Sequence, residues 1–197
     1  MRIRHGVYAT LAVLAVVLVW VIAAKPEYEI RGVGFDDAPA GVVVREFSDF
    51  QCPACGATYP VVKEIKGAYS REQMRFEYKH FPLRQIHPFA FKAAQASECA
   101  RDQERFEAYH DKLFENQRAL RVQDLKRYAA ELGLETKAFD ACLDSNAMAP
   151  RVEGNLQEGI RLGVHATPTF FINRKKHEGV LDAEKFKELV DAELAEA

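Results

Sequence analysis

Residues 42–55, VVVREFSDFQCPAC, place two cysteines at the point where a strand gives way to a helix. Residues 42–47 form a short hydrophobic run, which predicts a buried strand. The helix that follows carries Val62, Ile65 and Tyr69 on one face. The motif therefore predicts the start of an α/β fold with both sulfur atoms near a helix N-terminus.

The two thiols at this junction are predicted to form a redox pair. Cys52 is expected at the helix N-cap and Pro53 at the first helical position, where a missing N–H costs nothing. The unpaired amides and the positive end of the helix dipole would then face the Cys52 sulfur and lower the pKa of its thiol. Cys55, one helical turn later, is expected to be buried and to act as the resolving thiol.

A lone Cys-x-x-Cys motif also fits half of a zinc site or a small structural disulfide. A tetrahedral zinc site needs two further ligands at short spacing, whereas the remaining cysteines, Cys99 and Cys142, stand alone and far apart. The spacing favours the redox pair over zinc, and we expect neither a metal nor another cofactor.

The first 24 residues are typical of an export segment. Arg2 and Arg4 precede 18 positions without a charged residue, 7–24, which would form a helix of roughly 27 Å. The positive-inside rule then places the rest of the chain on the extracytoplasmic, or periplasmic, side. We favour an uncleaved anchor in the cell membrane over secretion after signal cleavage, because the run is longer than a usual signal-peptide core. In either case the rest of the chain faces an oxidising compartment.

We divide the chain into an anchor or signal sequence at 1–24, a tether at 25–41 and one domain at 42–197. The exported part carries 25 basic and 29 acidic residues and has no basic stripe interleaved with aromatic residues, so we expect no nucleic acid partner. The tether is too short for a separate dimerisation domain, and we expect a monomer.

Strand and helix patterns alternate along the domain and are interrupted by a long helical stretch. A second strand is predicted at 74–81. Apolar residues at helical spacing then dominate residues 88–162, which we expect to form a helical insertion. A buried strand at 169–172, a short antiparallel partner and a helix capped by Asp182 complete the domain.

Thr167 and Pro168 open the late strand, where a proline needs an explanation because it cannot donate to a sheet ladder. If the peptide bond between them were cis, the chain would bend beside the dithiol and leave the Thr167 backbone free to pair with an extended substrate. A trans proline at an ordinary strand start is the alternative, and the Cys-x-x-Cys motif favours the cis bond.

Together these features resemble the DsbA-like thiol–disulfide oxidoreductases of the thioredoxin superfamily. The resemblance rests on residues 46–55, on residues 163–171 (GVHATPTFF) and on the helical stretch between them. The 116 positions from Cys52 to Pro168 leave room for the insertion that marks this branch. The resemblance implies a thioredoxin-like α/β fold with a helical insertion, about 88–162, between the two halves. The uncharged run at 7–24 adds one N-terminal transmembrane helix before this fold.

The resemblance also implies roles for single residues. Cys52 matches the nucleophile, Cys55 the resolving thiol, Thr167 and Pro168 the substrate-binding cis-proline pair, and Glu46 the acidic residue under the active site. A buried carboxylate with a raised pKa at this position would take the proton from the resolving thiol. A glutamate that reaches water from an edge strand is the alternative.

Five residues leave questions open. The redox dipeptide Pro53-Ala54 lacks the histidine that the strongest oxidants of the family carry at its second place, so the redox strength is undecided. His165 is either a partial substitute near the sulfur or, as is commoner for a lone histidine, a surface residue. The remaining cysteines, 99 and 142, are either buried free thiols or a second, structural disulfide, which the resemblance favours.

The resemblance implies an exported enzyme that introduces disulfide bonds into extracytoplasmic proteins by thiol–disulfide exchange. Its partners would be reduced or unfolded exported proteins, a quinone-linked membrane re-oxidant, and the membrane itself through the N-terminal helix. The first alternative is a reductase or isomerase of the same fold that receives electrons from a membrane donor. The second is a non-enzymatic module that handles a metal or docks a partner through the same cysteines.

Overall fold

The computed structural model describes residues 41–196. The predicted anchor at 1–24 and the predicted tether up to residue 40 lie outside the described residues, so both stay predictions. Between residues 41 and 196, no helix is both long enough and apolar enough to cross a membrane.

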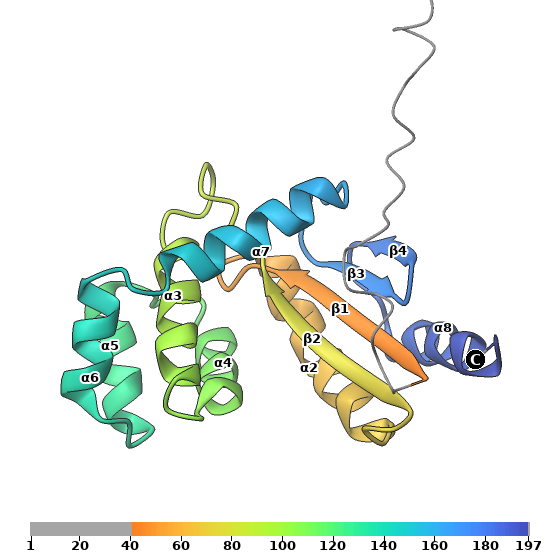
Figure 1. Cartoon of the computed structure of the whole chain (residues 1–197), viewed down its shortest axis with the longest axis horizontal. Coiled ribbons are helices and arrows are strands. Elements are labelled where there is room, and N and C mark those ends of the chain that lie inside the picture. Colours follow the sequence, from red (N-terminus) through yellow and green to blue (C-terminus); the bar gives the residue numbers. More distant parts are fainter. Residues whose placement is uncertain (1–40, 197) are drawn as a thin grey trace, which may run out of the picture. The chain divides into compact units, whose positions relative to one another are not determined.

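The described residues alternate strands and helices in the predicted order (Figure 1). The elements are β1 (Val42–Ser48), α2 (Pro53–Ala68), β2 (Met74–His80), α3 (Ala90–Arg101), α4 (Phe106–Glu115), α5 (Val122–Glu131), α6 (Thr136–Asp144), α7 (Ala149–Arg161), β3 (Thr169–Ile172), β4 (Lys175–Glu178) and α8 (Ala183–Glu196). Helices α3 to α7 lie within the stretch predicted as a helical insertion, which confirms the predicted fold class of the domain.

The strands form one mixed sheet in the order β2-β1-β3-β4. β1 pairs in parallel with β2 and antiparallel with β3, and β4 pairs antiparallel with β3. All seven residues of β1 are buried, because a strand with a neighbour on each side and helices on both faces has no contact with water. The hydrophobic run that begins the decisive stretch of sequence is therefore the centre of the sheet.

Alternate residues of β1 face different helices, as the pleat of a strand requires. Val42 and Val44 pack with Ile65 of α2 and Val190 of α8 in one hydrophobic cluster. Phe47 points to the opposite face, where α7 covers the sheet. The sheet therefore separates two helical layers, and the even-numbered positions of β1 face α2, which carries the two thiols.

One detail of α7 differs from the sequence pattern. The spacing of Val152, Leu156 and Ile160 predicts a common buried face, but Ile160 is 51% exposed. The helix contacts the sheet through Gly159, where an added Cβ would lie only 2.6 Å from the Phe81 ring. This close approach turns the buried face of α7 toward the glycine and leaves Ile160 in solvent.

The end of the domain is a hairpin followed by a helix. The sequence predicts a turn over residues 173–176, whereas β4 already begins at Lys175, because Asn173 takes the left-handed conformation (φ 51°) that closes a tighter turn. The Asp182 side chain accepts a 2.7 Å hydrogen bond from the Lys185 amide, so the predicted cap of α8 is confirmed.

The helical insertion is built around α3, whose alanine-rich sequence allows neighbouring helices to approach closely. Its core, which includes Tyr109, Leu125 and Phe139, is continuous with the residues around Cys55. The insertion is thus packed directly against the dithiol.

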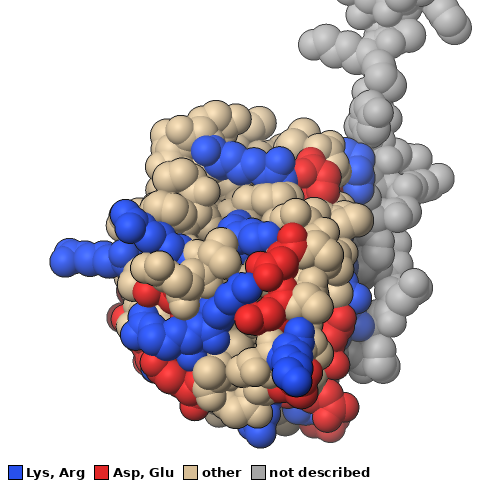
Figure 2. All heavy atoms as spheres, turned by 90° about the vertical axis from the view of Figure 1, so that its left-hand side faces the viewer, with Lys and Arg blue, Asp and Glu red and all other residues tan. Residues whose placement is uncertain are grey.

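On the side of the molecule where α5 and α6 lie, Figure 2 shows positive and negative side chains interspersed, without a large patch of one sign.

Candidate active site

The dithiol motif begins α2 with the predicted geometry. Cys52 is the N-cap, with extended backbone angles (φ −71°, ψ 122°), and Pro53 occupies the first helical position. The Gly56 amide donates to the Cys52 carbonyl oxygen at 3.1 Å, which closes the first helical turn around Cys55. Both cysteines are buried, and no disulfide joins them.

The surroundings of Cys52 stabilise its thiolate. A hydrogen bond from the Cys55 thiol is the main reason that the pKa of Cys52 falls to about 5, and this effect outweighs the opposing effect of burial. The Thr167 side chain and the amides of Ala54 and Cys55 lower the pKa further. In its protonated form, the Cys52 thiol donates to the Thr167 carbonyl oxygen at 3.3 Å. At neutral pH Cys52 is therefore a thiolate at the N-terminus of α2.

Cys55 has the opposite properties. Its side chain is fully buried, and burial, together with the charge of the Cys52 thiolate, raises the pKa of Cys55 far above its usual range. The negative charge of Glu46 raises it further. One sulfur is thus prepared to attack or to leave, while the other keeps its proton until a base removes it.

Glu46 lies in the centre of the sheet rather than at an edge. Its β1 position pairs with Tyr78 of β2 and Phe170 of β3, and the residue is only 2% exposed. Burial raises the pKa of Glu46 to about 7, and a hydrogen-bonding effect of Ser48 only partly opposes this. The alternative of a glutamate that reaches water is therefore wrong, while the predicted acid–base role stays a prediction.

Two hydroxyl groups share the buried space with Glu46 and were not foreseen from the sequence. Ser48 follows on the same face of β1, and Tyr78 lies opposite Glu46 on β2. Within residues 41–196, neither the Ser48 nor the Tyr78 hydroxyl has an aligned hydrogen-bond partner. The proximity of the Glu46 charge is one cause, after burial, that raises the pKa of Tyr78. Buried polar side chains therefore lie beneath the resolving thiol.

Thr167 and Pro168 lie directly beside the dithiol, although 115 positions separate Thr167 from Cys52. The peptide bond between Thr167 and Pro168 is cis. The Pro168 carbonyl oxygen accepts a 2.8 Å hydrogen bond from the Gly179 amide, which ties the loop to the β3–β4 hairpin. The predicted substrate-binding pair is thus fixed next to the reactive sulfur.

Asp49 organises the turn that leads into the dithiol, and sequence reasoning did not single it out. Its carboxylate accepts hydrogen bonds from the amides of Gln51 (2.7 Å) and Leu83 (2.8 Å) and from Nδ1 of His87 (2.8 Å). An aspartate that closes a turn onto an amide two residues later is a common local signal, but the contacts to residues 83 and 87 have no such signature. Asp49 therefore fastens the active-site turn to the loop that follows β2.

His165 does not lie where a substitute for the missing histidine of the dipeptide would be needed. Its side chain is exposed, and its charge acts on Glu178 of β4. The groups that lower the pKa of Cys52 are the Cys55 thiol, Thr167 and nearby amides, not His165. The structure favours the interpretation of His165 as a surface residue. Ala54 itself is partly buried in the first turn of α2.

A family model described as thioredoxin matches residues 30–192. The chain belongs to the thioredoxin family. Among solved structures, it is similar to BdbD from Bacillus subtilis, with a TM-score of 0.69 and 26% identity, covering 81% of this chain and 90% of that chain. Alpha-DsbA1 from Wolbachia pipientis has the same fold, with a TM-score of 0.68 and 24% identity over 80% of this chain and 87% of that chain.

These similarities confirm the resemblance to DsbA-like members of the thioredoxin superfamily and the enzyme class, thiol–disulfide oxidoreductase. The chain is also 37% identical over 158 residues to the Na(+)/H(+) antiporter NhaA 3 of Salinispora tropica, which covers 80% of this chain but 24% of the antiporter. The chain thus spans about a quarter of the length of the curated relatives it matches. The similarity concerns one part of those longer proteins.

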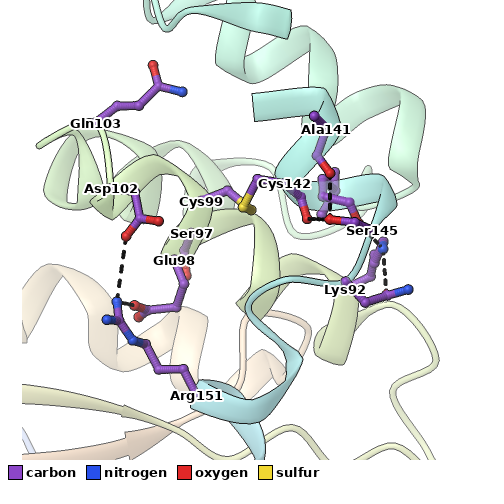
Figure 3. The surroundings of a disulfide bond; sticks show 12 residues. Lys92, Ser97, Glu98, Cys99, Asp102, Gln103, Ala141, Cys142, Ser145 and Arg151 are labelled. Carbon is purple, nitrogen blue, oxygen red and sulfur yellow. Dashed lines mark hydrogen bonds and ion pairs between the residues drawn. A yellow bond between two sulfur atoms is a disulfide. The ribbon is translucent and has the colours of Figure 1, made fainter. Parts of the chain in front are cut away.

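The second cysteine pair of this thioredoxin-family domain forms a disulfide between α3 and α6 (Figure 3). Cys99 and Cys142 are 43 positions apart, and their Cα atoms are separated by 6.0 Å. Around the bond, Arg151 of α7 forms a 2.9 Å ion pair with the buried Glu98, and Lys92 donates to Asn146 at 2.9 Å. The disulfide thus joins helices that also carry polar links to α7 and to the end of α6.

Proposed function

We propose that this chain is an exported oxidase that introduces disulfide bonds into extracytoplasmic proteins through Cys52 and Cys55. The observation that carries the proposal is the opposite displacement of two neighbouring pKa values: that of Cys52 falls to about 5, while that of Cys55 rises. A sulfur that is stable as a thiolate leaves readily from a mixed disulfide. Stabilisation of the reduced form makes the disulfide form a strong oxidant.

The exchange begins with the oxidised motif. A substrate thiolate attacks the Cys52 sulfur, the bond between Cys52 and Cys55 breaks, and the electron pair passes to the Cys55 sulfur. The Glu46 carboxyl, whose pKa near 7 keeps it partly protonated at neutral pH, supplies a proton to the buried Cys55 thiolate. In the reverse direction the Glu46 carboxylate accepts this proton. Glu46 therefore acts as acid in one direction and as base in the other.

A second substrate thiolate then attacks the substrate sulfur of the mixed disulfide. Cys52 leaves as the stabilised thiolate, and the substrate keeps the new disulfide. Two electrons have passed from the substrate to the enzyme. Of the two protons that the substrate thiols lose, one replaces the proton that Glu46 gave to Cys55, and the other passes to solvent. The enzyme is left with a Cys52 thiolate and a Cys55 thiol.

The backbone beside the cis-proline is proposed to hold the substrate chain. The Thr167 carbonyl oxygen lies 3.3 Å from the Cys52 sulfur, so an extended segment paired with this backbone brings its cysteine to the reactive atom. The Thr167 hydroxyl, which has no aligned partner within residues 41–196, faces the same position. Main-chain pairing would accept many sequences, as an enzyme that acts on unfolded chains requires.

The location and the re-oxidant belong to the same proposal. The uncharged run at residues 7–24 would anchor the domain on the outer side of the membrane, where reduced exported proteins appear. A quinone-linked membrane protein would remove the electrons from Cys52 and Cys55. A disulfide in the helical insertion is consistent with an oxidising compartment, because such bonds are rare where thiols are kept reduced.

Equilibration of the purified domain with glutathione buffers tests the direction of electron flow. The fraction of reduced Cys52 and Cys55 is measured by alkylation and mass spectrometry, which distinguishes this pair from the structural disulfide. A reduction potential between about −180 and −120 mV supports the oxidase, whereas a value near −270 mV overturns it in favour of a reductase. A Cys99→Ala, Cys142→Ala variant, measured in parallel, shows that the potential belongs to the dithiol.

Trapping identifies the partners. Cys55→Ala removes the resolving thiol and should accumulate mixed disulfides through Cys52, and their mass spectra identify substrates and the re-oxidant together. Cys52→Ala is the matched control and should trap nothing. Stoichiometric metal binding without trapped proteins would favour the metal-handling module instead. Within residues 41–196, no group of three or more His, Cys, Asp or Glu side chains is placed to hold a metal ion.

A further inference from the structure

A side chain from the helical insertion reaches the dithiol and has no part in the mechanism above. Gln117 lies in the segment between α4 and α5, and its Nε2 donates to the carbonyl oxygens of Phe50 (3.0 Å) and Cys52 (2.8 Å). Carbonyl oxygens only accept hydrogen bonds, so the end of the amide that faces them must be the NH₂ group. One side chain therefore holds both ends of the turn that leads into the motif.

Gly56, directly after the motif, leaves room for this contact. An added Cβ at Gly56 would lie 2.0 Å from Oε1 and 2.7 Å from Cδ of Gln117. A glycine inside a helix is less favourable than alanine, so its presence in the first turns of α2 needs a compensating reason. The space that it leaves for the Gln117 amide supplies that reason.

The contact fixes the peptide group that orients Cys52. Because Pro53 has no N–H, the peptide between Cys52 and Pro53 offers only its carbonyl oxygen to neighbouring groups. That oxygen accepts hydrogen bonds from the Gly56 amide (3.1 Å) and from Gln117 (2.8 Å). With the Phe50 carbonyl held by the same amide, the turn has little freedom to rotate, and the Cys52 sulfur stays directed at Thr167.

We propose that Gln117 is a positioning residue that holds the dithiol turn in its reactive geometry and thereby links the redox site to the helical insertion. The inference rests on the proposed role of Cys52 as the nucleophile. A purely structural glutamine would contribute hydrogen bonds to stability alone. A positioning glutamine must also change the titration of Cys52 when its donors are lost.

Gln117→Met tests the proposal, because methionine has a similar length, carries no charge and offers no donor to the two carbonyl oxygens. We expect the pKa of Cys52, followed by the ultraviolet absorbance of its thiolate and by the rate of alkylation, to rise by about one pH unit. This rise corresponds to about a tenfold smaller thiolate fraction at a pH below both values. Circular dichroism shows whether the variant is folded.

Gln103→Met is the matched control. Gln103 also belongs to the insertion, and its amide pairs with the backbone of Glu135 through one donated (3.3 Å) and one accepted (2.8 Å) hydrogen bond. The control loses a donor to a backbone carbonyl in the same way, so we expect a lower stability and an unchanged titration of Cys52.

Gly56→Ala keeps the proposal testable if Gln117→Met does not fold. The new methyl group displaces the Gln117 amide, while alanine itself favours the helix. We again expect a raised pKa of Cys52. If either folded variant titrates like the wild type, the inference is wrong and the proposed function is untouched. If wild-type Cys52 titrates like an ordinary cysteine, the proposed function fails, and this inference fails with it.

Discussion

The two cysteine pairs of this domain place the same chemical groups in contrasting surroundings. Cys52 and Cys55 lie in one helical turn at the start of α2, where free amides and a neighbouring thiol stabilise a thiolate. Cys99 and Cys142 join α3 and α6, 43 positions apart. Cys99 lies inside a helix whose amides are already paired along the chain, so no free amide faces its sulfur.

The contrast shows that the position of two cysteines in the fold decides whether their disulfide exchanges with other thiols or stabilises the folded chain. A bond inside one turn closes almost no loop, so it adds little entropy-based stability and is free to exchange. A bond between distant helices restricts the unfolded chain and gains nothing from reactivity. Four predictions test this comparison, from the largest expected effect to the smallest.

The first prediction separates the pairs by activity. Cys52→Ser should reduce the oxidation of a reduced, unfolded model protein to the uncatalysed rate, because serine cannot form the mixed disulfide. Cys99→Ala, Cys142→Ala should retain activity within roughly twofold, as expected for distant independent sites. Both variants are assayed with equal concentrations of folded protein. Comparable losses of activity in the two variants would contradict the proposed division into a catalytic and a structural cysteine pair.

The second prediction separates the pairs by stability. Removing the Cys99–Cys142 bond releases a loop of 43 positions, which should lower the free energy of unfolding by about 4 kcal/mol. Urea unfolding of the wild type and of the double alanine variant measures this difference. Reduction of the dithiol alone should not produce such a loss. An unchanged urea midpoint in the double variant would show that the bond does not stabilise the insertion.

The third prediction concerns the acid beneath the reactive pair. The pKa of Glu46 is about 7 in the folded protein and roughly 4.3 in the unfolded chain, so the unfolded chain binds fewer protons between these values. The contribution of Glu46 to the free energy of unfolding should therefore fall as the pH rises from about 4 to about 7. Glu46→Gln does not ionise, and above pH 7 it should be more stable than the wild type by about 4 kcal/mol.

Urea unfolding of both reduced proteins near pH 4 and near pH 8 measures this effect. The difference between Glu46→Gln and the wild type should be small at the lower pH and large at the higher one. A difference that is the same at both pH values would contradict a raised pKa. Slower exchange by Glu46→Gln, measured in the same preparations, would connect the carboxyl to the chemistry.

The fourth and smallest effect concerns the dipeptide. Ala54→His places a donor and a partial positive charge beside the Cys52 thiolate, which should stabilise the reduced form. We expect the reduction potential to rise by about 30 mV, equivalent to about 1.4 kcal/mol. Ala57→His, on an exposed position of the same helix, is the control and should leave the potential unchanged. A lower potential in Ala54→His would show that the dipeptide acts by another route.

Local patterns in the sequence were sufficient for much of the reactive site. The N-cap role of Cys52 follows from the proline after it and the hydrophobic strand before it, and both lie within a few positions. The late strand was likewise predicted at its observed bounds, Thr169–Ile172, because its apolar run follows a proline directly. These features depend on neighbours in the chain, which a sequence displays.

The parts that escaped prediction depend on contacts across the fold. Asp49 and Gln117 are polar residues in turns. Nothing near them in the chain shows that Asp49 binds the loop after β2 or that Gln117 binds the dithiol turn. Tyr78 looked like one more residue of an alternating strand, yet it lies opposite Glu46 under the resolving thiol. Ile160 fitted a helical pattern, but it is exposed because α7 contacts the sheet through Gly159 instead.

The sequence by itself determined the two halves of the site, a dithiol at a helix start and a threonine–proline pair at a strand start, because each half is written in adjacent residues. Only the tertiary structure decided that Thr167 lies within reach of Cys52, that Cys99 bonds to Cys142 and that Glu46 is enclosed. Distances between segments and exclusion of water arise from packing, and they set the reactivity that residue order alone leaves open.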